Sequence, residues 1–156
     1  MIRYAYLTND YYKDHPDLVK ILDVDEENKH NMRTHLCLNI SYNGYNVLIP
    51  LRHNLGEEKR AYGRIGFSAP TQSKPTAGLD YRYMMIVDDS KYIRFDNPRI
   101  PYKQAEIIRM NYEKIEEQAI EYINAYIKVA QKKRVKYKAR FRESSLINFH
   151  KELRIQ

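Results

Sequence analysis

Residues 33–54, RTHLCLNISYNGYNVLIPLRHN, carry the strongest local structural pattern in the chain. Asn43 and Gly44 separate two apolar runs, and Asn-Gly favours a two-residue hairpin turn because both of its central residues need a positive φ. We therefore expect a β-hairpin with strands at 34–41 and 45–51. Alternation with a period of two directs one apolar face of this hairpin toward the core, formed by Leu36, Leu38, Ile40, Val47 and Ile49.

The exit of the second strand carries polar groups. Pro50 lacks an amide donor, so we expect the strand to end there or to lie at a sheet edge. Arg52, His53 and Asn54 follow at once and supply a cation, a titratable ring and an amide. A rigid hairpin that ends in polar side chains is a common way for a scaffold to present a site. We place the candidate chemistry at this exit.

The size and composition of the chain favour one cytoplasmic domain over residues 1–156. A chain of 156 residues is long enough for an ordinary hydrophobic core. It has no apolar run that could cross a membrane, and its first residues lack a signal-peptide pattern. The single cysteine, Cys37, cannot form an internal disulfide, which fits a reducing compartment.

The rest of the chain predicts further strands and then helices. The expected strands are 2–7, a short one at 65–67 inside a long loop, 83–88 and 91–95, the last two as antiparallel neighbours. The expected helices are a turn near 11–13, a short amphipathic helix at 18–22, a long helix over 102–131 and a short C-terminal helix at 145–155. Strands that precede most of the helices indicate an α+β fold.

The basic residues gather in one segment, 128–142, KVAQKKRVKYKARFR. It holds eight Lys and Arg residues and no acid, which exceeds the net charge of +7 of the whole chain. Tyr137 and Phe141 lie among these cations, a pattern typical of phosphate binding with base stacking. The alternative is a solvated helix face or tail. The candidate RNA-binding residues are Lys128, Lys132, Lys133, Arg134, Lys136, Lys138, Arg140 and Arg142, with Lys59 and Arg60 near the hairpin exit.

Several chemistries lack their sequence signatures. No glycine-rich phosphate loop is present, and no paired-cysteine, HExxH or EF-hand spacing occurs, so we expect no metal and no cofactor. Acidic residues at 23–27 read as a surface loop. Asp88 and Asp89, at a strand end, could bind a metal ion in a nuclease, but a turn explains them.

RNA can be cleaved without a metal when three groups are present. A base takes the proton of the 2′-OH, a cation stabilises the charge at phosphorus, and an acid protonates the leaving 5′-oxygen. Histidine as a residue type can serve as base or acid near neutral pH, so His53 is a candidate for either role. Arg52 can bind phosphate oxygens in the transition state. The other histidines read as ordinary surface or half-buried residues: His15, His30, His35 and His150.

Several stretches, taken in order, resemble a known family. They are YYKDHPDLVKIL (11–22), the region of Arg33, NGYNVLIPLRHN (43–54), AGLDYRYMMIVDDSKYI (77–93) and the long helix from about residue 102. Together they cover most of residues 1–130. This order is similar to that of the toxins of type III toxin–antitoxin systems, the ToxN/AbiQ family, and most of all to its TenpN-like branch. The tail after Lys128 is not part of the resemblance.

The resemblance implies a fold and a function. The fold would be a strongly bent antiparallel sheet or partial barrel, related to MazF and Kid toxins, with added helices. The activity would be a metal-independent endoribonuclease that leaves a 2′,3′-cyclic phosphate on cellular or phage mRNA, in phage defence by abortive infection. The partner would be a small repeated antitoxin RNA that folds as a pseudoknot and inhibits the toxin in a closed protein–RNA complex.

By position, the resemblance also implies site residues. The active-site loop of the family falls on Arg52, His53 and Asn54, and a basic residue before the hairpin falls on Arg33. His53 stands where TenpN-like members tend to have serine. Either His53 is the working base, or the loop is rebuilt and activity is altered. Two other functions stay open: a non-catalytic RNA- or DNA-binding module using 128–142, and a protein-interaction domain with a charged tail.

Overall fold

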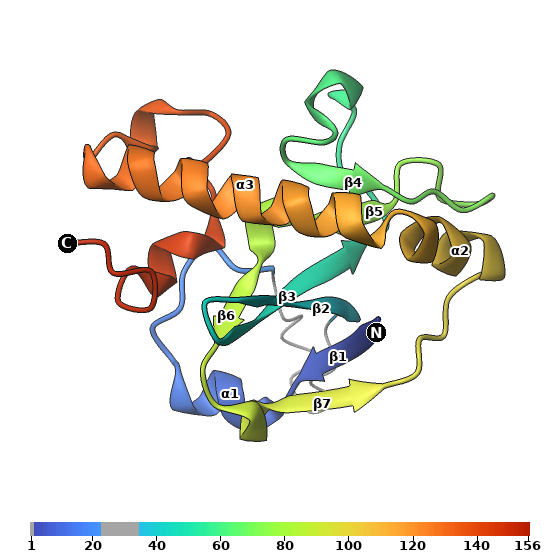
Figure 1. Cartoon of the computed structure of the whole chain (residues 1–156), viewed down its shortest axis with the longest axis horizontal. Helices are drawn as coiled ribbons and strands as arrows, with labels where there is room; N and C mark the ends of the chain where they lie inside the picture. The colour runs from blue at the N-terminus through green and yellow to red at the C-terminus, as the bar shows by residue number, and fades with distance from the viewer. Residues whose placement is uncertain (1, 23–34) are drawn as a thin grey trace.

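The computed structural model describes residues 2–22 and 35–156, which form an α+β fold (Figure 1). Its seven-stranded sheet has the order β4-β5-β3-β2-β1-β7, with β6 also paired to β3, and all of these pairs are antiparallel. The strands are β1 (Arg3–Leu7), β2 (Cys37–Tyr42), β3 (Tyr45–Arg52), β4 (Gly66–Ser68), β5 (Gly78–Asp80), β6 (Met85–Val87) and β7 (Ile93–Asp96). The described α-helices are α1 (Asn9–Asp14), α2 (Tyr102–Met110) and α3 (Tyr112–Gln131).

The central hairpin is confirmed. Asn43 and Gly44 have φ values of 49° and 86°, which a type I′ turn requires, and they connect β2 directly to β3. Leu38 and Val47 are fully buried in the core beneath them. The bounds of the strands differ from those expected: β2 begins at Cys37, and β3 continues through Pro50 to Arg52.

Pro50 lies inside β3 at a position where no partner strand would accept a hydrogen bond from its amide. The amide of Leu51 donates to the carbonyl of Leu36, toward β2, so the nitrogen of Pro50 faces the opposite edge. On that edge β6 pairs with residues 46–48 and β5 pairs with Leu51 and Arg52. The proline therefore lies between two partner strands, because β6 and β5 pair with different parts of β3.

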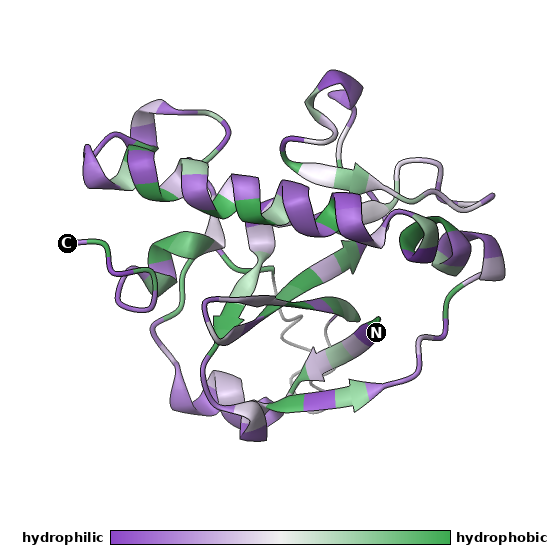
Figure 2. Cartoon of the chain, viewed as in Figure 1, coloured by the Kyte–Doolittle hydropathy of each residue, from purple (hydrophilic) through white to green (hydrophobic). Residues whose placement is uncertain are grey.

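Helix α3 lies across the sheet (Figure 1), and its polar and apolar residues alternate as expected of an amphipathic helix (Figure 2). The hydroxyl of Tyr42 donates to Asn124, which ties β2 to α3. The buried positions of α3 recur with helical spacing and form one apolar stripe: Ile115, Ala119, Tyr122, Ile123, Tyr126 and Ala130. Each buried isoleucine contributes roughly 1.5–3 kcal/mol to the hydrophobic stabilisation.

The expected long helix over 102–131 is two helices, because Asn111 interrupts it. Asn111 has φ −114° and ψ 17°, outside the helical range, and its side-chain Nδ2 donates to the carbonyl of Ile107 at 2.7 Å. Asparagine competes with the backbone for such hydrogen bonds, which is why it disfavours helix interiors.

Three other expected elements differ from the structure. No helix forms at 18–22: Lys20 has a φ of 53°, in the left-handed region, and the side chain of Asn148 binds both the amide and the carbonyl of Val19. The strand at Ile93–Asp96 pairs with β1 and not with β6. The C-terminal helix is a 3-10 helix, η6 (Ser145–Phe149), which Ser144 caps and which turns follow.

The described strands form an open sheet, since β4 and β7 end it on opposite sides. The relation to MazF and Kid toxins stays a prediction. The acidic stretch at 23–32, His30 and Arg33 lie outside the described residues. No described helix is both long and apolar enough to cross a bilayer.

Candidate active site

A groove of about 580 Å³ opens at the end of β3. Its charged or titratable lining is entirely basic among the described residues: His35, Arg52, His53, Lys74 and Arg99. The other lining residues that bear polar side chains are Asn54, Thr71, Ser73 and Gln104. The groove therefore matches a polyanion in charge and offers hydroxyl and amide groups for hydrogen bonding.

Three parts of the chain build the groove. The end of β3 forms one wall, and the loop between β4 and β5 forms another. That loop has a tight turn, in which the amide and the side chain of Thr71 bind the carbonyl and the amide of Lys74. Gln104, on α2, donates from Nε2 to the carbonyl of Ala69 and so joins the helix to the loop. The groove is thus held together by specific polar contacts.

Asp80 lies behind the groove and binds two arginines. Its carboxylate is fully buried and accepts hydrogen bonds from Nη1 of Arg52 at 3.0 Å and from Nε and Nη2 of Arg82 at 2.9 and 2.8 Å. Tyr83 lies beside both guanidiniums, with its ring centroid 5.0 Å from Cζ of Arg52. Hydrogen bonds to Asp80 raise the pKa of Arg82. Two arginines around one carboxylate leave a net positive charge at the groove.

His35 lies directly across the hairpin from Arg52, if the β2–β3 register that pairs Cys37 with Pro50 is continued. It is half-buried, whereas His53 is exposed. Burial lowers the pKa of His35, and the positive charges of Arg52 and His53 lower it further. The ring of His35 is therefore neutral near pH 7 and can accept a proton.

Asn54 has a structural contact that the sequence did not reveal. Its Oδ1 accepts hydrogen bonds from the amide of Gly56 at 2.9 Å and from the hydroxyl of Thr76 at 2.7 Å. These bonds fix the loop that follows β3 against the loop that precedes β5. Asn54 thus shapes the groove as well as lining it.

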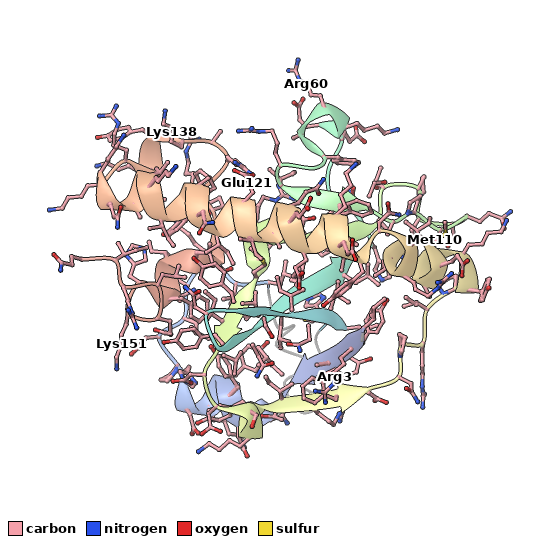
Figure 3. All side chains as sticks on the ribbon, viewed as in Figure 1. Arg3, Arg60, Met110, Glu121, Lys138 and Lys151 are labelled. Carbon is pink, nitrogen blue, oxygen red and sulfur yellow. The ribbon has the colours of Figure 1, made fainter. Side chains whose placement is uncertain are left out.

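The structure separates the other predicted RNA contacts from this groove. Lys59 and Arg60 belong to a 3-10 helix, η2 (Lys59–Ala61), and Arg60 lies at the outer tip of its loop (Figure 3). An exposed ion pair joins Arg60 to Glu58 at 3.3 Å. Neither residue lines the groove.

The segment 128–142 lies at the far end of α3 from the groove (Figure 1). At 1.5 Å per residue, the 20 residues of α3 extend about 30 Å. The first four residues of the segment, 128–131, form the end of α3, and a 3-10 turn, η5 (Val135–Tyr137), follows. The groove and the basic segment are therefore two separate surfaces.

Arg140 differs from the other cations of this segment. Its guanidinium binds the carbonyl of Arg64 and the carboxylate of Glu121, and its side chain is only 11% exposed. The pKa of Glu121 is lowered by this hydrogen bond. Arg140 thus holds the segment to α3. The exposed cations are Lys128, Lys132, Lys133, Arg134, Lys136, Lys138 and Arg142.

Sequence reasoning missed several residues of the site. His35 could have been found from the hairpin register, which places it opposite Arg52. Asp80 and Arg82 stand as charges beside an apolar run, a signal of a buried ion pair. Lys74 and Arg99 reach the groove from loops that carry no local signal.

Acidic, histidine and cysteine side chains do not gather into any group of three or more that could hold a metal ion within residues 2–22 and 35–156. Asp88 and Asp89 belong to a turn, in which Oδ1 of Asp89 accepts the amide of Lys91 at 3.0 Å and caps η4 (Ser90–Tyr92).

No protein-family model matches the chain, and no curated protein matches it. One solved structure, described as "New insights into the mechanism of bacterial Type III toxin-antitoxin systems: selective toxin inhibition by a non-coding RNA pseudoknot", is similar over 88% of this chain and 78% of its own chain, with 12% identity and a TM-score of 0.44. A likeness with so low a TM-score carries no argument about fold or function, so the family assignment stays a prediction.

Proposed function

We propose that the protein is a metal-independent endoribonuclease toxin of a type III toxin–antitoxin system and that the groove is its active site. The observation that carries this proposal is the presence of Arg52, His35 and His53 in one basic groove. These residues supply a cation and two titratable rings, the three groups that metal-free cleavage of RNA requires.

The lowered pKa of His35 suggests how the roles divide. Neutral His35 takes the proton of the 2′-OH, and the 2′-oxygen attacks the adjacent phosphorus. Arg52 binds the non-bridging phosphate oxygens as negative charge builds on them. His53, in its protonated form, gives a proton to the 5′-oxygen as the P–O5′ bond breaks. The products are a 2′,3′-cyclic phosphate and a free 5′-hydroxyl.

Asp80 acts as a positioning residue in this mechanism. It holds the guanidinium of Arg52 from behind, at 3.0 Å, while leaving the side chain 31% exposed toward the groove. A fixed guanidinium stabilises a transition state better than a mobile one, because no reorganisation is needed as the charge develops.

The substrate and the partner in this proposal are both RNA. Lys74 and Arg99 would bind phosphates on either side of the cleaved bond, and Arg33, Asn54, Lys59 and Arg60 would make further RNA contacts. A small repeated pseudoknot RNA would inhibit the toxin in a closed complex, as the resemblance to the ToxN/AbiQ family and its TenpN-like branch implies. The protein would act in the cytoplasm in phage defence.

The test is cleavage of RNA by purified variants. We expect His35→Ala and His53→Ala each to slow cleavage by about 10²–10⁴-fold, the usual contribution of a general acid or base. Arg52→Gln should also abolish growth arrest on expression. Arg109→Gln is the matched control, because Arg109 is an exposed arginine on α2 that pairs with Glu106 outside the groove.

The end group of the product and the need for a metal complete this test. A 2′,3′-cyclic phosphate resists phosphatase until acid opens the ring, and cleavage should be unchanged by EDTA. Full activity in both histidine variants would refute the assignment. Salt-dependent binding of RNA with no cleavage would favour the non-catalytic module, which the separate basic segment 128–142 could serve.

A further inference from the structure

Tyr137 is the unusual residue of the basic segment. Its side chain is 61% exposed, whereas Phe141, four residues later, is buried. The Cζ of Arg134 and the Nζ of Lys136 lie 5.6 and 5.1 Å from the centroid of its ring. Both distances lie within the range of a cation–π contact, about 6 Å. The exposure of the ring makes it accessible to a further planar group.

The loop that carries Tyr137 is held in place. The amide of Tyr137 donates to the carbonyl of Arg134, and Nε of Arg142 donates to the carbonyl of Lys136 at 3.1 Å. From outside the loop, Nζ of Lys20 donates to the carbonyl of Arg142 at 2.7 Å. The exposed ring is therefore presented by a fixed backbone.

The base of this loop is anchored in the core. Phe141 packs edge-on against Tyr122 and Tyr126, with ring centroids 5.1 and 5.7 Å apart. Arg140 forms an ion pair with Glu121, the last acidic residue of α3, and neutralises its charge. The loop thus combines an exposed aromatic ring with several cations that form no ion pair within residues 2–22 and 35–156, and the charge of Glu121 is compensated.

We infer that this surface is a second binding site, separate from the groove, for a single-stranded RNA segment, and that one base of the RNA stacks on Tyr137. The cations that flank the ring, Arg134, Lys136, Lys138 and Arg142, bind the neighbouring phosphates. An exposed aromatic ring amid cations is how proteins bind single strands without reading their sequence. The choice of RNA over other polyanions rests on the proposed function.

The two sites together change how tightly one RNA is held. A strand long enough to pass along α3 would occupy the groove and the Tyr137 site at once, and the second contact would then be intramolecular. A short strand would occupy one site alone. Length dependence of binding is therefore part of the inference.

The experiment measures the affinity of full-length protein for a fluorescein-labelled 2′-O-methyl RNA of about ten nucleotides, a length that suits a single-strand site. This probe lacks the 2′-OH, so the proposed mechanism cannot cleave it. We expect Tyr137→Ala to weaken binding by about 5- to 100-fold and Tyr137→Phe, which keeps the ring, to change it by less than about twofold. Met110→Ala is the control for loss of an exposed apolar side chain, because Met110 is 71% exposed on α2.

Two further measurements separate stacking from charge. Lys136→Gln and Lys138→Gln should each reduce the slope of log affinity against log salt by about 0.7, while Tyr137→Ala should leave that slope unchanged. The effect of Tyr137→Ala should persist in an Arg52→Gln background, because the two sites are separate.

The outcomes distinguish this inference from the proposed function. If Tyr137→Ala binds the RNA more weakly and the wild-type protein shows no detectable RNA cleavage, the second site is supported and the ribonuclease function is refuted. Unchanged binding in Tyr137→Ala, with cleavage intact, would refute the site alone. Binding of phosphatidylserine vesicles that depends on Tyr137, in place of RNA, would also overturn the inference.

Discussion

The buried carboxylate of Asp80 accepts a hydrogen bond from Nη1 of Arg52 at 3.0 Å, across the junction between β5 and β3. Asp80 is fully buried, while Arg52 is 31% exposed, so the pair spans the boundary between the core and the groove. Arg82 completes the arrangement from the other side at 2.8 Å. The charge of the groove is therefore coupled to the stability of the sheet.

Asp80→Asn should lower both stability and activity. The substitution leaves two arginines without a counter-charge, and we expect a loss of about 2–3 kcal/mol, less than for a fully buried pair because both arginines reach solvent. A urea titration with an unchanged slope would measure this loss. Cleavage should fall by about 10- to 100-fold at a temperature where the variant stays folded, because Arg52 loses its orientation.

Asp89→Asn is the matched control for that substitution. Asp89 caps a 3-10 helix in the same way as Asp80, but its pair with Lys91 is exposed and 3.8 Å long. Its loss should cost less than about 0.5 kcal/mol. Equal effects of the two variants would show that the charge of Asp80 is not what matters.

Gly78→Ala should open the groove wall. Gly78 pairs with Arg52, and a Cβ there would overlap the carbonyl oxygen of Phe67. Backbone cannot yield to such a contact, so we expect a loss of about 1–3 kcal/mol and displacement of β5. Gly44→Ala, with nothing within 4 Å of its added Cβ, tests instead the cost of a positive φ. A Gly78→Ala protein with wild-type stability would contradict the observed strand packing.

Lys133→Gly should stabilise the protein. Lys133 has a φ of 58° where α3 ends, and its amide donates to the carbonyl of Ala130 while that of Arg134 donates to Val129, the pattern of a Schellman motif. Glycine adopts this conformation without steric cost, so thermal unfolding should show a gain of about 0.5–1 kcal/mol. Lys132→Gly removes the same charge from a residue with φ −87° and should instead destabilise. A gain of stability in both variants would indicate that removal of a positive charge, and not the backbone conformation of Lys133, is the cause.

Stability should fall below pH 6.5 because of two half-buried histidines. Burial lowers the pKa of His35 and of His150 from the ordinary 6.5, so the unfolded chain takes up protons before the folded protein does. Their contribution is complete above pH 6.5 and is lost as the pH falls toward the folded pKa values. Nε2 of His150 also lies 2.7 Å from the hydroxyl of Tyr126, and a protonated ring could not accept from it.

Urea midpoints at pH 7.5 and pH 5.5 would measure this dependence. The double variant His35→Gln/His150→Gln should lose less stability between these two pH values than the wild-type protein does. An equal loss in both proteins would assign the acid sensitivity to other groups.

The hairpin and its polar exit were predictable because the information is local. Asn43 and Gly44 determine the turn, and the turn determines which residues face each other, so the position of Arg52 followed from a few neighbouring residues. The apolar stripe of α3 was equally local, because helical periodicity is read directly from the sequence.

The other elements depend on partners far away in the chain. β5 has three residues in a loop rich in glycine and proline, and it is a strand only because Leu51 and Phe67 pair with Leu79. The segment 18–22, expected to form a helix, instead contacts Asn148, which lies 129 residues beyond Val19 and binds its amide. Most of the groove was unpredictable for the same reason, since Lys74 and Arg99 come from separate loops.

The division of β3 between two partner strands affects which part of the sheet opens most easily by local unfolding. The β4–β5 unit joins the rest of the sheet through two residue pairs, Leu51 with Leu79 and Arg52 with Gly78, whereas β2 pairs with β3 along six. Opening of the smaller unit therefore needs far less free energy than global unfolding, so its amides should exchange with deuterium first. The wall of the groove formed by β3 is therefore as stable as the core, whereas the wall formed by the β4–β5 unit can open locally. Bound RNA would slow amide exchange mainly in the β4–β5 unit.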